Sequence, residues 1–103
     1  MNENILNSVK SKTNELQGKL KELITVKDDQ KKVHKIVNEI RSLQNAMEKA
    51  YRELGPFLEK MHIDKQTLNN TSNDIKRACN QPSESNIQNA LKKVDALISQ
   101  LAA

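Results

Sequence analysis

The sequence has few of the residues from which small-molecule sites and disulfide frameworks are built. Tyr51 and Phe57 are its only aromatic side chains, and it contains no tryptophan. Because ligand pockets and binding hot spots depend on aromatic side chains, neither a deep small-molecule site nor a bound cofactor is expected. The single cysteine, Cys79, has no partner for a disulfide within the chain, so nothing marks an oxidising compartment.

Long apolar runs are also missing. No stretch approaches the roughly 18 apolar residues that a helix needs to span a bilayer. Residues 1–4 lack the basic start and the apolar run of a signal peptide. These absences predict a cytoplasmic protein with no membrane span.

The net charge of +4 is not concentrated in one segment. Lysine and arginine alternate with acids at helix spacing, as in Glu15 to Lys19 and Glu48 to Arg52, which is typical of solvent-exposed helix faces. A phosphate-binding surface would instead gather its positive charge in one place. A nucleic-acid partner is therefore not expected.

What the sequence does contain is an apolar residue at every third or fourth position along four stretches. The second stretch has no gap and consists of Val33, Ile36, Ile40, Leu43, Met47, Ala50 and Leu54. A helix places residues three and four apart on one face, so each stretch predicts an amphipathic helix. The predicted helices cover about 3–25, 29–54, 57–80 with a break near 62–64, and 84–101. With short connections, they predict an all-α, antiparallel up-down-up-down four-helix bundle forming a single domain, 1–103.

The first two helices are expected to be separated by a turn. Asp28 or Asp29 is a suitable N-cap for the second helix, and the apolar repeat changes phase at this point. The alternative is one unbroken helix over 3–54, because no glycine or proline in the link at 25–30 forbids it.

The later boundaries follow from capping chemistry. Gly55 and Pro56 end the second helix, and Asp64 is a plausible N-cap for residues 65–80. That helix is rich in asparagine, serine and threonine, so it is expected to be short, kinked or partly ordered. Ser83 or Ser85 caps the last helix, and Ser85 would form a capping box with Gln88.

Candidate catalytic and metal-binding groups are few. His34 and His62 stand apart from each other, and Cys79 falls on an apolar stripe, where a small buried side chain is the stronger interpretation. Zinc needs three or four suitably spaced ligands, and these residues do not supply them. No catalytic residue, metal ligand or cofactor-binding residue is therefore assigned, and the chain is predicted not to be an enzyme.

The elbow after the second helix holds both aromatic residues. The candidate partner-binding residues there are Tyr51, Arg52, Phe57, Leu58 and Met61. Either the aromatic side chains cover the end of the bundle, or they form a contact patch for another protein, since aromatic residues and arginine concentrate at hot spots. Apolar residues beside the main stripes, such as Ile5, Ile24 and Ile98, either complete the core or widen a groove.

The leading hypothesis is a small non-enzymatic protein that binds another protein through a helix face, as a regulator, chaperone or inhibitor. A homo-oligomer is also possible, as a self-associating coiled coil or bundle subunit. The turn Gly55-Pro56-Phe57-Leu58-Glu59-Lys60-Met61 resembles the opening of the third helix in some bacteriocin immunity proteins. Those proteins are similar in length, basic and four-helical, and this resemblance implies toxin protection as a further hypothesis.

Overall fold

The computed structural model describes residues 2–102, and their secondary structure is helical without a strand. Five helices follow one another: α1 (Asn2–Thr25), α2 (Gln30–Leu54), α3 (Phe57–Lys60), α4 (Lys65–Asn80) and α5 (Glu84–Ala102). The all-α prediction is confirmed for this part of the chain. The predicted helix boundaries, including the break near 62–64, agree with the structure to within one or two residues.

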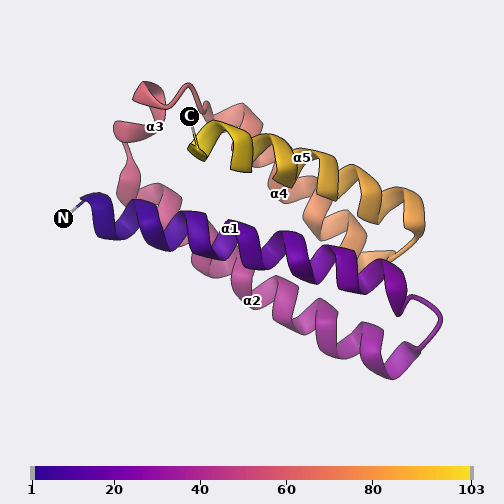
Figure 1. Cartoon of the computed structure of the whole chain (residues 1–103). Helices are drawn as coiled ribbons and strands as arrows, with labels where there is room; N and C mark the ends of the chain where they lie inside the picture. The colour runs from indigo at the N-terminus through magenta and orange to yellow at the C-terminus, as the bar shows by residue number, and fades with distance from the viewer. Residues whose placement is uncertain (1, 103) are drawn as a thin grey trace.

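The four long helices lie side by side in an elongated body of 41 × 21 × 19 Å. α1 and α2 run in opposite directions, as do α4 and α5, and the short α3 lies at one end (Figure 1). α1 packs against both α2 and α5, α5 packs against α4, and α4 also meets α2. α5 therefore contacts both α1 and α4, and α2 likewise contacts both α1 and α4.

A capped turn separates α1 from α2, so the alternative of one unbroken helix is wrong. The Asp29 carboxylate accepts hydrogen bonds from the backbone N–H groups of Lys31, at 3.2 Å, and Lys32, at 3.3 Å. The Asp29 N–H itself donates to the Val26 carbonyl at 2.8 Å, which closes the turn. These bonds satisfy N–H groups that an isolated helix start would leave without partners.

The other helix ends show which caps the sequence predicts correctly. Gly55 has φ of 47°, a backbone conformation that glycine adopts at little cost, and its N–H donates to the Tyr51 carbonyl. The Asp64 carboxylate accepts from the Thr67 N–H at 2.6 Å and caps α4 as expected. At the last helix Ser83 is the cap, since its hydroxyl oxygen accepts from the Asn86 N–H at 3.2 Å.

The predicted capping box of Ser85 with Gln88 is wrong. α5 begins at Glu84, so Ser85 already lies within its first turn and is not in a position to cap it. The Gln88 amide instead contacts the Glu84 carboxylate, at 3.5 Å.

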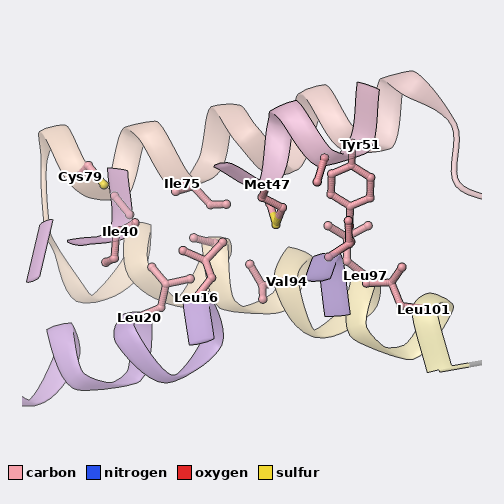
Figure 2. Close-up of a cluster of buried hydrophobic side chains, with 14 of the residues drawn as sticks. Leu16, Leu20, Ile40, Met47, Tyr51, Ile75, Cys79, Val94, Leu97 and Leu101 are labelled. Atoms are coloured by element: carbon pink, nitrogen blue, oxygen red, sulfur yellow. The ribbon is translucent and has the colours of Figure 1, made fainter. Parts of the chain in front are cut away.

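The apolar stripes of the four long helices meet in one core. Figure 2 shows core side chains from α1, α2, α4 and α5 pointing toward one another. The largest fully buried side chains include Leu16, Leu20, Leu23, Ile40, Leu54, Ile63, Ile75, Ile87 and Leu97. Ile5, Ile24 and Ile98 are partly buried and pack against this cluster, so they extend the core.

The expectation of a short or kinked helix at residues 65–80 is also wrong. α4 is continuous over 16 residues. Its buried Thr71 donates its hydroxyl to the Thr67 carbonyl at 2.9 Å, which satisfies that group inside the helix. Ile75, Ala78 and Cys79 are buried in the core, and this tertiary packing outweighs the weak helix propensity of the asparagines.

Candidate functional site

Polar side chains fill part of the seam between α2 and α4, and one of them, Gln44, is buried. The Gln44 amide donates to the Ser72 hydroxyl at 2.6 Å and to the Ser72 carbonyl at 3.2 Å. The Ser72 hydroxyl in turn donates to the Glu48 carboxylate at 2.6 Å. Gln44 is buried, whereas Ser72 and Glu48 are half-buried. This polar cluster holds the two helices together where apolar side chains would otherwise interdigitate.

An open groove of about 1100 Å³ lies between α2 and α4, and it extends toward α3. The segment 55–64 closes one end of the groove as it carries the chain from α2 to α4. The apolar side chains in its lining are Met47, Tyr51, Pro56, Leu58, Ile63, Leu68 and Leu97. Its polar lining comes from Glu48, Arg52, Glu59, Asp64, Lys65, Asn69, Thr71, Ser72, Asn73 and Lys76.

The structure brings three of the five predicted partner-binding residues into this groove. Tyr51, Arg52 and Leu58 line it, and Arg52 is exposed while Tyr51 and Leu58 are buried. Phe57 and Met61 are outside its lining. The Phe57 side chain is 38% exposed, and the Lys60 ammonium lies 5.2 Å from the centre of its ring. The predicted elbow is therefore divided. Three of its residues line the groove, Phe57 is exposed on α3, and Met61 is half-buried and packs against the core.

Tyr51 forms part of both the groove wall and the core, as Figure 2 shows by its place among the labelled core side chains. It is 4% exposed, and its hydroxyl has no hydrogen-bond partner among the described residues. Burial raises the pKa of the Tyr51 phenol to about 12, against a smaller lowering by the Thr13 hydroxyl. The Thr13 hydroxyl donates its own proton to the Val9 carbonyl at 2.6 Å. At neutral pH the phenol is therefore protonated and is not a base.

The groove residues of α4 were missed in the sequence. Lys65, Asn69 and Asn73 recur at a spacing of four, which places them on one helix face without showing whether that face meets water or another helix. A signal was present in the apolar stripe of Leu68, Ser72, Ile75 and Cys79, because a serine interrupts it. That serine lies in the polar seam that bounds the groove.

The remaining sequence candidates lie away from the groove. His34 is exposed, and its ring nitrogen is 3.4 Å from the Asn38 amide. His62 is exposed in the link between α3 and α4 and has a positive φ of 59°. Cys79 is buried, and this burial raises the pKa of its thiol although Arg41 lies close enough to oppose the shift.

Two further observations describe the chain between residues 2 and 102. No three of its histidine, cysteine, aspartate or glutamate side chains come together in a group that could hold a metal ion. None of its helices combines the length and the apolar character that crossing a membrane requires.

Comparison of the chain with protein-family models, with curated proteins and with solved structures gave no match.

Proposed function

We propose that this chain is a non-enzymatic protein that binds a helix of another protein in the groove between α2 and α4, as a regulator, chaperone or inhibitor. The four long helices would act as an antiparallel up-down-up-down bundle that presents this groove. The observation that carries the proposal is the groove itself, which has apolar residues in its lining and exposed polar side chains at its edges.

A helix fits this site better than a small molecule does. The groove is open to solvent and exceeds the roughly 300–1,000 Å³ of typical ligand pockets. Its long walls are two helices, and a third helix can bury an apolar stripe between them at the usual interaxial distance of about 8–10 Å. The half-buried Leu68 and the exposed Pro56 would contact that stripe, while Met47 and Leu58 lie buried beneath them.

The titratable groups of the groove support a binding role rather than a catalytic one. Tyr51 holds its proton far above neutral pH, as its raised pKa indicates. The Asp64 carboxylate is occupied by the Thr67 N–H, which lowers its pKa and makes it a weaker base. Glu48 is hydrogen-bonded to Ser72. No acid and base in the groove are paired in the way that proton transfer would need.

The test should target a groove residue whose side chain is not part of the buried core. Leu68 meets this condition because it is half-buried, whereas Tyr51 is so deeply buried that its removal would damage the fold. Leu91 on α5 is a matched control, since it is half-buried and outside the groove lining. A photo-crosslinking amino acid at Asn73 would first capture the native partner from the host, for identification and purification.

We expect Leu68→Gln to weaken binding of that purified partner by about fivefold or more, and Leu91→Gln to leave it within about twofold. Isothermal titration measures the affinities, and circular dichroism checks that both variants keep their helical content. A partner that crosslinks elsewhere on the surface, or binds both variants equally, would contradict the proposal.

Self-association is a second candidate, and the exposed Phe57 favours it. Among the described residues, the Phe57 ring is the one large apolar side chain that is exposed to solvent. Sedimentation equilibrium at tens of micromolar would show a dimer that Phe57→Ser dissociates, whereas a monomer would contradict this candidate. Toxin protection stays a prediction, and expression in a sensitive strain tests it.

A further inference from the structure

The seam between α2 and α4 is the least extensive of the four seams between neighbouring long helices. The side-chain hydrogen bonds across it join polar groups. The Arg41 guanidinium donates to the Asn80 side-chain carbonyl at 3.1 Å. Closer to the groove, Gln44 donates to Ser72, which in turn donates to Glu48. Water can replace each of these partners when the helices separate, so the bonds oppose separation only weakly.

The groove further reduces the contact between α2 and α4. It is an open space of about 1100 Å³ between the two helices, and they are not packed against each other along that part of the seam. Two of the three buried polar side chains among the described residues, Gln44 and Thr71, also lie at this seam. Separating α2 from α4 therefore exposes less apolar surface than separating two fully packed helices would.

The seam between α1 and α5 is more extensive. The side chains that these two helices bury are apolar apart from Thr13. Figure 2 shows Leu16 and Leu20 of α1 in one cluster with Val94 of α5, and all three are fully buried. Because the burial of apolar surface is the main stabilising term in folding, α1 and α5 stay together more firmly than α2 and α4 do.

We infer that the bundle opens along the α2–α4 seam without unfolding, with the α1–α5 seam as the hinge, and that the polar side chains of the α2–α4 seam permit this opening. The moving parts are two helical hairpins, α1 with α2 and α4 with α5. Openings of this kind involve one cooperative part of a fold and need less free energy than global unfolding. The open form gives solvent access to Met47 and Leu58, which the closed bundle buries.

Thiol labelling of the full chain tests the opening, and two threonines provide matched probe positions. Thr71 and Thr13 are 1% and 0% exposed. Each donates its hydroxyl to the carbonyl four residues earlier in its own helix. Thr71 lines the groove, whereas Thr13 lies on α1, which contacts α2 and α5. Thr71→Cys and Thr13→Cys, each combined with Cys79→Ala, place one thiol at either position, and the native Cys79 is a third probe at the far end of α4.

The labelling rate of each protein is compared with the rate that its own global unfolding in urea allows. We expect the thiols at positions 71 and 79 to react at least about tenfold faster than global unfolding allows, and the thiol at position 13 to react at the global rate. Reaction of all three thiols at the global rate would overturn the inference. So would fast reaction at position 79 alone, which shows fraying of the end of α4, or equally fast reaction at position 13, which shows loosening of the whole bundle.

A second variant tests the role of the polar side chains. Gln44→Leu with Ser72→Ala replaces a polar pair by apolar groups that water cannot solvate, so labelling of Cys79 should slow by about tenfold. Gln88→Leu with Ser85→Ala makes the same exchanges on the exposed face of α5 and should leave the rate within about twofold. Unchanged or faster labelling in the seam variant would overturn the inference. The proposed function would still stand, because Leu68 and Pro56 are accessible in the closed bundle.

Discussion

Replacing Tyr51 with phenylalanine should stabilise the protein, because it removes a buried hydroxyl that has no hydrogen-bond partner among the described residues. An unsatisfied buried hydroxyl costs about 1–3 kcal/mol, while the ring and its packing are retained in phenylalanine. We expect the free energy of unfolding to rise by about 1 kcal/mol at neutral pH. For a chain of this size that corresponds to an increase of about 5 °C in Tm.

The same substitution should change how stability depends on alkaline pH. In the unfolded chain the phenol ionises near its ordinary pKa of 10.0, whereas in the folded protein it holds its proton to about 12. The stability contributed by the neutral phenol is therefore complete below pH 10 and is lost as the pH rises to about 12. The loss amounts to about 2–3 kcal/mol, and Tyr51→Phe should not show it.

Urea unfolding followed by circular dichroism measures both effects, with Tyr51→Phe compared with the wild type at each pH so that lysine titration cancels. Because Tyr51 is the only tyrosine and tryptophan is absent, tyrosinate absorbance reports this one phenol directly. A less stable Tyr51→Phe at neutral pH would refute the reasoning. Ionisation of the phenol at its ordinary pKa in a chain that is still helical would refute it as well.

Thr13 provides a control for a hydrogen bond between its own hydroxyl and the Tyr51 phenol. If its hydroxyl bound the phenol, the effects of Thr13→Val and Tyr51→Phe on the free energy of unfolding would be coupled. Because the Tyr51 hydroxyl has no hydrogen-bond partner among the described residues, we expect the two effects to add within about 0.5 kcal/mol.

Two further predictions concern helix caps. Asp29→Ala should lower the free energy of unfolding by about 1 kcal/mol because it removes the α2 cap. The adjacent Asp28→Ala should change it by less than about 0.5 kcal/mol, and equal losses in urea unfolding would contradict the assignment. The Thr67 N–H lowers the pKa of Asp64 from 3.8, so the stability contributed by that carboxylate is present above this value and is lost as the pH falls further. Asp64→Asn keeps a capping oxygen and should lose less stability on acidification; parallel acid-unfolding curves would count against this.

Local chemistry was sufficient to predict the helices and most of their ends. Asp29, Gly55 and Asp64 act within one turn of their own position, so their effect is visible in the sequence. The choice between Ser83 and Ser85 was not visible in the sequence, since either residue can cap a helix and the start of α5 depends on how that helix packs. The continuity of α4 was not predictable either, because buried Ile75 and Cys79 outweigh local propensity only once the core exists.

The groove was predicted only in part. Tyr51, Arg52 and Leu58 were singled out because they flank a helix end marked by Gly55. The groove residues of α4 were not singled out, because Lys65, Asn69 and Lys76 have the pattern of any solvated helix face.

The periodicity of apolar residues and the capping side chains determined that the chain is helical, where most of the helices begin and end, and which face is buried, because these depend on neighbours within one or two turns. Tertiary structure decided that Gln44, Glu48 and Ser72 meet across α2 and α4 and that a groove opens beside them. It also decided that the Tyr51 hydroxyl is buried without a partner among the described residues. These residues are far apart in the sequence, and only the packing of whole helices brings their side chains together.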